Sequence, residues 1–279
     1  MEKRLLEIRK NIFLAAFYGK SNGAHIAPSY SSVEILYSLY MNGVVNVDPQ
    51  NPKWVERDRV ILSKGHASLA LYEMLAERGF FSRDTLRTFC FPNSILGGEP
   101  NMVEIPGVDA TTGSLGHGLP YAIGIAMGLK MNGSKAKVYV VVGDGECQEG
   151  SIWEAVMAAY RQKLDNLVVV IDNNGLQKMD LVSNTMSIND WQEKWSAFGW
   201  QVDIVDGHNV DELTKALKRE NLEKLPRVII ANTIKGKGVS IIENSVEWHF
   251  RMPNKRQLKV FMEELGIAEE ELKNAESVY

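Results

Sequence analysis

The sequence predicts an α/β protein built on a doubly wound parallel sheet, with helices on both faces of that sheet. Two segments, KVYVVV at residues 137–142 and LVVVI at residues 167–171, are continuous apolar runs rich in β-branched residues, as is typical of strands buried on both faces. The segment between them has the apolar spacing of a helix. A strand, a helix and a second strand at this spacing form a βαβ unit, whose strands run parallel.

The N-terminal part of the chain extends this pattern. Residues 5–18 place apolar side chains at helical spacing, and residues 31–40 begin like a capped helix with an apolar face. The segment RVILS at residues 59–63 is predicted to be a short buried strand. A turn at residues 64–66 follows it, and residues 67–78 return to helical spacing.

The second half of the chain continues the alternation. Residues 151–163 form the helix between the two long strands, with apolar side chains on one side. Residues 202–205 and 228–231 are predicted to be two more strands, and residues 210–222 the helix between them. Helices that alternate with continuous apolar strands favour a sheet that is covered on both faces.

Composition narrows the class of protein. The 279 residues are 45% hydrophobic and 24% charged, which is usual for a globular protein with a large core. The net charge of -4 argues against a nucleic-acid partner. No apolar run approaches the roughly 20 residues that span a bilayer, so no membrane partner is expected. Cys90 and Cys147 show neither a disulfide framework nor metal spacing, and no signal peptide precedes them, so we expect a cytoplasmic protein.

Polar residues follow the two long strands at the point where each strand ends. Asp144 comes directly after the first strand, and Asn174 closely follows the second. Because ligands bind outside the carboxyl ends of parallel strands, these side chains converge if the strands are neighbours. A carboxylate and an amide oxygen suit Mg²⁺, and Gly143 and Gly145 let the backbone approach a phosphate closely. Gly-Asp-Gly alone is more often a tight turn, but its place between strand ends favours a site for Mg²⁺ and a diphosphate.

Four segments resemble one known family. The stretch GDGECQEGSIWEAVMAAYRQKLDNLVVVIDNN resembles the thiamine diphosphate motif, which runs from GDG to a terminal NN or DN. Three others are similar to transketolases in particular: RDRVILSKGHASLALY around His66, PGVDATTGSLGHGL around Gly113, and TIKGKGVSIIENSVEWH ending at His249. The similarity runs from about residue 21 to about residue 253 and keeps the order of the family's first domain. It implies the thiamine diphosphate-binding fold.

The resemblance implies thiamine diphosphate and Mg²⁺ as cofactors, and it implies roles for the matched residues. Asp144, the Asn174 side chain and the Leu176 carbonyl would hold Mg²⁺. His25 would face the substrate hydroxyls, and His249 would lie between the diphosphate and the substrate, so these two are the expected catalytic residues.

The expected cofactor-binding residues come from the same four segments. They are His66, Gly113, Ser114, Leu115, Gly143, Asp144, Gly145, Glu146, Asn174, Leu176, Lys235 and His249. Gly113, Ser114 and Leu115 would pack against the aminopyrimidine ring. Lys235 could reach the diphosphate, and a solvated lysine is the alternative. His117 is interpreted as close to the cofactor, with a helix start as the alternative, and His208 as part of a turn.

Two positions depart from the family pattern. Glu99 stands where transketolases usually have a histidine that helps hold the hydroxyl end of the sugar. An acidic residue there puts the usual ketose donor in doubt. Ala24 precedes His25, and Ile26-Ala27-Pro28 follows it, where a tighter Gly-His-Pro-Gly is common, so we expect a differently shaped loop around His25.

The resemblance also implies a partner chain. The sequence ends at Tyr279, about where the first domain of a transketolase ends. Residues 1–279 would then form a single diphosphate-binding domain, and a C-terminal subunit would supply the pyrimidine-binding and C-terminal domains. We expect the N-terminal subunit of a split transketolase, active only with its partner and arranged as an α2β2 assembly.

The implied activity is a transferase reaction. A two-carbon ketol unit would pass from a ketose to an aldose, with sugars or sugar phosphates as substrates. The thiazolium ring of the cofactor would serve as the electron sink, and histidines would move protons because their pKa lies near neutrality.

Other functions share parts of the pattern. The alpha subunit of a 2-oxo acid dehydrogenase has the same cofactor motif, but His25, His66 and His249 in sugar-handling segments favour transketolase. A synthase that joins pyruvate to a triose phosphate fits the VEWH segment less well. A transketolase-like enzyme for a non-standard sugar stays open, given Glu99. A catalytically idle cofactor-binding or assembly subunit is disfavoured by the intact Asp144 and Asn174.

Overall fold

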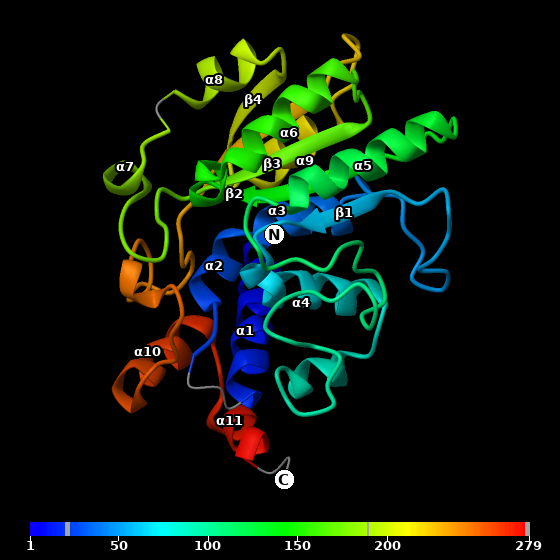
Figure 1. The fold of residues 1–279 in the computed structure, drawn as a ribbon. Coiled ribbons are helices and arrows are strands. Elements are labelled where there is room, and N and C mark those ends of the chain that lie inside the picture. The colour runs from blue at the N-terminus through cyan, green and yellow to red at the C-terminus, as the bar shows by residue number, and fades with distance from the viewer. Residues whose placement is uncertain (20–22, 189, 277–279) are drawn as a thin grey trace.

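The computed structural model describes residues 1–19, 23–188 and 190–276 (Figure 1). The strands are β1 (Arg59–Leu62), β2 (Val138–Gly143), β3 (Leu167–Asn173), β4 (Gln201–Asp206) and β5 (Arg227–Asn232). The α-helices are α1 (Glu2–Tyr18), α2 (Ile26–Ser31), α3 (Val33–Met41), α4 (Ser68–Arg78), α5 (Gly118–Met131), α6 (Gly150–Arg161), α7 (Val182–Thr185), α8 (Trp191–Ala197), α9 (Val210–Lys218), α10 (Lys255–Leu265) and α11 (Glu269–Glu276). Short 3₁₀ turns are η1 (Gly65–Ala67), η2 (Arg83–Thr88), η3 (Gly145–Gln148) and η4 (Val246–Trp248).

The strands form a parallel sheet in the order β1-β2-β3-β5-β4. Each of the predicted strands is present in it. β2 lies beside β3, with Val138 opposite Leu167 and Gly143 opposite Asp172. Because the two strands are parallel and in this register, the residues that follow them meet at the same edge of the sheet.

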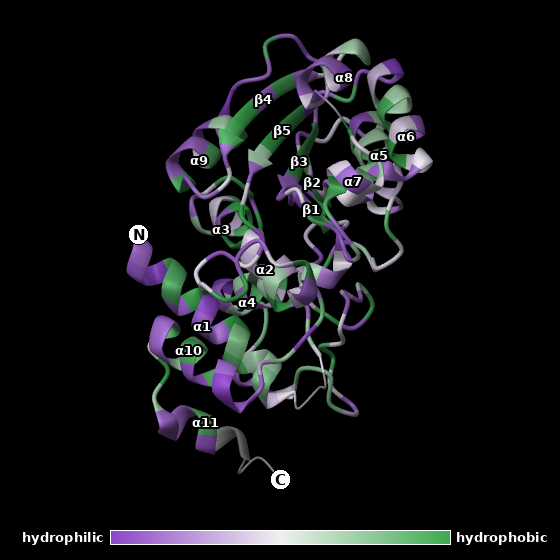
Figure 2. Ribbon diagram, turned by 90° about the vertical axis from the view of Figure 1, so that its left-hand side faces the viewer, coloured by the Kyte–Doolittle hydropathy of each residue, from purple (hydrophilic) through white to green (hydrophobic). Residues whose placement is uncertain are grey.

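The two faces of the sheet pack into separate hydrophobic cores. On β2, Tyr139 and Val141 belong to one core, while Val138, Val140 and Val142 belong to the other, because successive side chains of a strand point to opposite faces. The first core includes side chains of α1 to α4 and α9, and the second includes side chains of α5, α6 and α8. Figure 2 shows α3 and α9 on one side of the sheet and α5 and α6 on the other. The predicted doubly wound fold is confirmed.

Two predicted helices have different ends in the structure. The helix predicted over residues 31–40 is α3, which starts at Val33 directly after the separate helix α2. The Ser31 and Ser32 hydroxyls both donate to the Pro28 carbonyl at this break. The helix predicted over residues 210–222 ends at Lys218 as α9. The backbone leaves the helical conformation at Arg219. The Arg219 carbonyl accepts a hydrogen bond from the Arg227 side chain.

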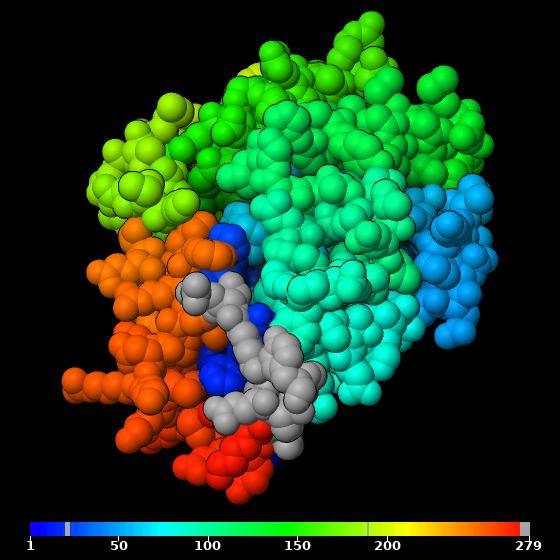
Figure 3. Space-filling view, turned by 60° about the horizontal axis from the view of Figure 1, so that its bottom comes forward, coloured from blue at the N-terminus to red at the C-terminus, as the bar shows by residue number. Residues whose placement is uncertain are grey.

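Helix α1 joins the sheet domain to the C-terminal helices. It packs against α4, α10 and α11, and the rings of Phe13 and Phe261 lie 4.7 Å apart between their centroids. Figure 3 shows part of this N-terminal segment, in blue, between the orange and red C-terminal segments and the cyan segment. Within the described ranges, α1 included, no helix has the length and apolar character needed to cross a membrane.

Candidate functional site

A cavity of about 480 Å³ opens at the carboxyl ends of β2 and β3. It is the place where ligands are expected on a parallel sheet. Most of the predicted site residues line it: His25, His66, Gly113, Leu115, Gly143, Asp144, Gly145, Glu146, Asn174, Leu176, Lys235 and His249. Ser114, which was also predicted, is exposed and lies outside this lining.

Asp144 and Asn174 converge at the edge of the sheet, as the strand ends predicted. One carboxylate oxygen of Asp144 accepts a hydrogen bond from the Gly145 amide at 2.7 Å, and the other accepts one from the Gly175 amide at 2.5 Å. The Asn174 side-chain oxygen accepts one from the Leu176 amide at 3.1 Å. The loop after β3 is therefore tied to the residue that follows β2.

The donor set around Asp144 fits Mg²⁺. Burial and the nearby Asp172 carboxylate raise the pKa of Asp144 to about 6, so its ionised form gains from a cation beside it. A carboxylate, an amide oxygen and the Leu176 carbonyl are hard ligands, and Mg²⁺ commonly takes one or two carboxylates together with phosphate oxygens. Among the described residues there is no group of three or more His, Cys, Asp or Glu that could hold a metal by itself. The oxygen donors of Asp144, Asn174 and Leu176 suit Mg²⁺ in a site where phosphate oxygens complete the shell.

Three histidines from separate segments form a cluster beside Asp144. The ring centroids of His25, His66 and His249 are each 5.2 Å from the other two. Burial, followed by nearby lysines, lowers the pKa of His25 to about 4. Burial and Lys235 lower the pKa of His249 to about 3, and burial and Lys64 place that of His66 well below its ordinary value. All three rings are therefore neutral at pH 7 and can both donate and accept hydrogen bonds.

Lys235 is buried at the wall of the cavity, with 1% of its surface exposed. Its ammonium lies 3.2 Å from the Leu176 carbonyl, 3.3 Å from the Gln177 carbonyl and 2.9 Å from Nδ1 of His249. Burial and Lys64 lower its pKa to about 8, so it stays protonated at neutral pH. The alternative of a solvated lysine is wrong, because these contacts hold the side chain inside the protein.

Glu146 braces the loop that carries Asp144. One of its carboxylate oxygens accepts hydrogen bonds from the Ser63 hydroxyl and the Gly116 amide, and the other accepts one from the Gly143 amide. Because it accepts these hydrogen bonds, Glu146 fixes the position of Gly143 at the wall of the cavity.

His117 lies at the start of α5. It is exposed and stands outside the lining of the cavity. The helix-start alternative therefore describes His117 better than a place close to the cofactor.

Glu99 lies at the junction of two cavities. Besides the cavity at the strand ends, it lines a neighbouring cavity of about 360 Å³, and His25 and His66 line both as well. A Cβ atom on Gly113 would lie 1.9 Å from a carboxylate oxygen of Glu99. Gly113, which has a φ of +148°, thus leaves the space that the Glu99 carboxylate fills. Glu99 is solvent-exposed and yet faces the site.

A buried ion pair beneath the site has no counterpart in the sequence-based expectations. The Lys64 ammonium pairs with the Asp172 carboxylate, and both side chains are almost wholly buried. Ser31, Ser32 and Thr233 donate hydroxyl hydrogen bonds to the same carboxylate. In the sequence, Asp172 is seen only to end one predicted strand, and Lys64 only to lie in the turn after another. Neither position indicates that the two side chains pair. The network joins α2 to the ends of β1, β3 and β5.

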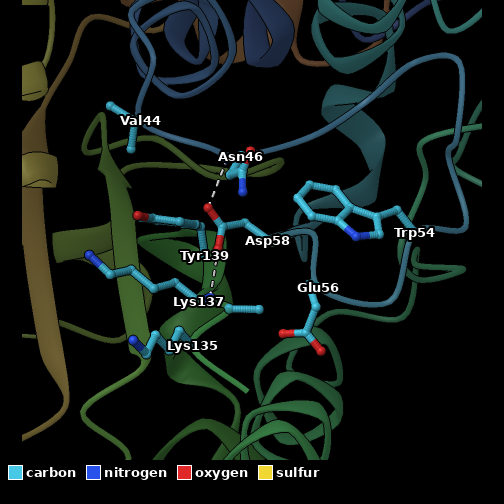
Figure 4. A pocket seen from close by; sticks show the side chains of 9 residues that line it. Val44, Asn46, Trp54, Glu56, Asp58, Lys135, Lys137 and Tyr139 are labelled. Carbon is cyan, nitrogen blue, oxygen red and sulfur yellow. Dashed lines mark hydrogen bonds between the residues drawn. The ribbon is translucent and has the colours of Figure 1, made fainter.

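Another cavity, of about 340 Å³, lies at the opposite edge of the sheet (Figure 4). Trp54, Lys135 and Tyr139 are among its lining residues. Asp58 accepts hydrogen bonds there from the backbone amides of Asn46 and Lys137. These contacts fix the chain before β1 and β2, at the amino ends of the strands, far from the edge that carries Asp144.

Comparisons with known proteins agree with this geometry. Residues 11–279 match the family model of the transketolase thiamine diphosphate binding domain. The A subunit of the apulose-4-phosphate transketolase from Actinobacillus succinogenes is 40% identical over 265 residues, covering 95% of each chain. The 6-deoxy-6-sulfo-D-fructose transketolase subunit SqwG of a Clostridium species is 40% identical over 232 residues, covering 83% of this chain and 84% of that protein.

A solved structure extends the comparison to the fold. The transketolase of Campylobacter jejuni superposes with a TM-score of 0.86 at 29% identity, covering 99% of this chain and 46% of that one. The chain thus spans about half the length of that transketolase. Thiamine diphosphate, which the sequence led us to expect, is the cofactor that the matched domain binds. From the matched model, the subunit relatives and the shared fold, we conclude that this chain belongs to the transketolase family and carries its thiamine diphosphate binding domain.

Proposed function

We propose that this chain is the N-terminal, diphosphate-binding subunit of a split transketolase, a transferase that moves a two-carbon ketol unit from a ketose to an aldose. The observation that carries the proposal is the cavity in which Asp144 and Asn174 meet the cluster of His25, His66 and His249. One part of this cavity offers oxygen ligands to a metal, and the other offers neutral rings for proton transfer.

In this proposal each wall of the cavity has a separate task. Asp144, the Asn174 side chain and the Leu176 carbonyl hold Mg²⁺. His66, Gly145, Lys235 and His249 contact the diphosphate region, for which the buried ammonium of Lys235 supplies positive charge. Gly143 lets the backbone come close, and Gly113, Ser114 and Leu115 lie against the aminopyrimidine ring.

The histidines handle the sugar. Bound thiamine diphosphate supplies the electron sink that allows a carbon–carbon bond next to a carbonyl to break. His25 and His249 are neutral at pH 7 because burial and lysines lower the pKa of each. A neutral imidazole can take a proton from a hydroxyl at one nitrogen and donate one at the other. His25 is therefore suited to take a proton from a substrate hydroxyl, while His249, whose Nδ1 lies 2.9 Å from the Lys235 ammonium, is suited to orient the substrate by donating a hydrogen bond.

The rest of the catalyst is placed on a partner chain. Residues 1–279 form one domain in this proposal, and a C-terminal subunit carries the pyrimidine-binding and C-terminal domains, in an α2β2 assembly. Support comes from the Actinobacillus relative, itself named as one subunit, which this chain matches over 95% of its length, and from the Campylobacter enzyme, of which it matches 46%. The names of the two subunit relatives, on apulose-4-phosphate and 6-deoxy-6-sulfo-D-fructose, support substituted sugars as the substrate class.

The split arrangement has a direct test. The purified chain is expected to show no measurable ketol transfer, and mixing it with a chain that carries the pyrimidine-binding domain should restore turnover. The measurement is a coupled assay over a panel of ketoses and aldoses, with thiamine diphosphate and Mg²⁺ present. Robust turnover by the single chain would contradict the partner requirement. A reconstituted pair that binds the cofactor but turns over no ketose would contradict the transketolase function itself.

Glu99 should decide which sugars are used. We expect Glu99→His to change the order of preference among ketose and aldose substrates of the reconstituted pair. A carboxylate only accepts hydrogen bonds and adds negative charge, whereas histidine can also donate. Specificity is a difference in transition-state binding, so the ratios of kcat/KM between substrates are the measurement.

The matched control for Glu99→His is Glu104→His. Glu104 lies in the same loop but is exposed and outside both cavities, so its replacement should leave the ratios unchanged. If Glu99→His scales every substrate equally, Glu99 has no part in specificity.

A further inference from the structure

The loop that follows β5 carries Lys235 and is held by a partly buried histidine from another part of the chain. The Ile234 amide donates to Nε2 of His208 at 2.7 Å. His208 follows β4, and only 13% of its side chain is exposed. Its other nitrogen, Nδ1, lies 3.0 Å from a carboxylate oxygen of Glu34 in α3. The interpretation of His208 as part of a turn therefore missed its main contacts. Ile234 is separated from His208 by 26 positions in the sequence, and Glu34 by 174.

The direction of these bonds fixes the proton of His208. A backbone amide can only donate, so Nε2 accepts and carries no proton. The proton of the neutral ring then lies on Nδ1 and is donated to Glu34. Glu34 also accepts two hydrogen bonds from Arg9 of α1, at 2.7 and 2.9 Å, and both of these side chains are buried. His208 is thus locked in one tautomer by partners on two sides.

Arg9 supports the same loop at a second point. A Cβ atom on Gly238, which has a φ of +97°, would lie 2.8 Å from Cδ of Arg9. The Gly236 amide donates to the Ala27 carbonyl at 3.1 Å. Residues 234–238 are therefore held in place by contacts with Arg9, with His208 and with the Ala27 carbonyl of α2.

The position of this loop determines which hydrogen-bond acceptors the Lys235 ammonium reaches. An ammonium has three donors and no acceptor, and here its three neighbours are two backbone carbonyls and Nδ1 of His249, 2.9 Å away. Nδ1 must accept that hydrogen bond, so the proton of the neutral His249 ring lies on Nε2. Nε2 is then the ring nitrogen that is left for a ligand, and it can offer only a hydrogen bond to an oxygen.

We propose that Arg9, Glu34 and His208 are positioning residues of the cofactor site, which hold the loop so that Lys235 keeps His249 in its Nε2–H tautomer. His249 then acts as a hydrogen-bond donor towards a diphosphate or substrate oxygen. Naming that ligand rests on the proposed function. The tautomer is a property of this chain alone and can be tested without a partner or a substrate.

The test reads each histidine directly. The chain is labelled with ¹⁵N-histidine, and a long-range ¹H–¹⁵N correlation spectrum at neutral pH distinguishes the two tautomers. Replacing His208 and His249 one at a time identifies their signals. The expected result is Nδ1–H for His208 and Nε2–H for His249. The opposite tautomer at either position would overturn the proposal.

Two lysine variants in one loop isolate the cause. Lys235→Met should release His249 into a mixture of tautomers, because Nδ1 loses its donor. Lys237→Met is the matched control, since Lys237 is two residues away but partly exposed and 3.8 Å from Glu243, and it should leave the His249 signal unchanged. An unchanged His249 signal in Lys235→Met would overturn the tautomer assignment.

A third variant tests whether His208 holds the loop that carries Lys235. His208→Leu removes the acceptor of the Ile234 amide, and we expect the His249 signal to become mixed as in Lys235→Met while circular dichroism stays native. A native fold with an unchanged His249 signal would overturn the positioning role of His208. The lysine variants decide the tautomer assignment even if His208→Leu does not fold.

Discussion

Replacing Asp144 by alanine is expected to lower the affinity of the reconstituted pair for thiamine diphosphate at least about tenfold, because interactions with a charged group are worth about 1.5–3 kcal/mol each. Asp144 is the one carboxylate among the proposed metal ligands, and its oxygens are oriented by the Gly145 and Gly175 amides. Without it, Mg²⁺ loses its charged ligand and the diphosphate loses the metal that neutralises it. Titration calorimetry with thiamine diphosphate at fixed Mg²⁺ measures the change.

A matched variant and a pH series separate this role from a loss of folding. Asp165→Ala removes a partly exposed carboxylate just before β3, at the amino end of the strand, and it should keep the full affinity. Because the pKa of Asp144 is raised to about 6, its carboxylate is protonated progressively as the pH falls below that value. Cofactor affinity should therefore weaken from pH 7 to pH 5. Equal affinity for wild type and Asp144→Ala at pH 7 would show that Asp144 does not hold the metal.

The parts of the fold that were predictable from sequence are those set by local patterns. The runs at residues 137–142 and 167–171 are apolar on both faces because the sheet is covered on both sides, so their continuous apolar, β-branched composition identified β2 and β3. Asp144 and Asn174 were predictable as partners because parallel neighbouring strands end at the same edge. The Gly-Asp-Gly and Asn-Asn motifs could therefore be assigned to one site from their positions after the two strands.

The parts that escaped sequence analysis depend on contacts between distant segments. His208 looked like a turn residue, but its nitrogens bond Glu34 and the Ile234 amide, and no local pattern encodes those partners. Lys235 could not be separated from a solvated lysine, since burial of a long charged side chain depends on what closes over it. The second cavity beside Glu99 is formed by the chain around residues 23–25, 89–90 and 250, which only the fold brings together.

The Lys64–Asp172 pair leads to the largest expected effect on stability. Asp172→Ala should lower the free energy of unfolding of the chain by about 3–5 kcal/mol, which is the usual cost of removing one partner of a buried ion pair. Lys64 would be left as an uncompensated charge with 2% of its side chain exposed. The hydroxyls of Ser31, Ser32 and Thr233 would lose their shared acceptor as well. Urea denaturation of the isolated chain, followed by circular dichroism, measures the change.

Two comparisons show whether burial of the charge is the cause. Asp165→Ala breaks the exposed pair with Lys130, in which both side chains are about a third or more accessible, and it should cost no more than about 1 kcal/mol. The double variant Lys64→Met with Asp172→Asn removes both charges, so it should be more stable than Asp172→Ala although it carries two substitutions. Burial opposes ionisation of Asp172, but Lys64 and the hydroxyls hold its pKa below the ordinary value. The stability it adds is therefore complete above about pH 4 and is lost as the pH falls through the lowered pKa. If Asp172→Ala unfolds at the same urea concentration as Asp165→Ala, the buried pair does not stabilise the ends of the strands that carry the site.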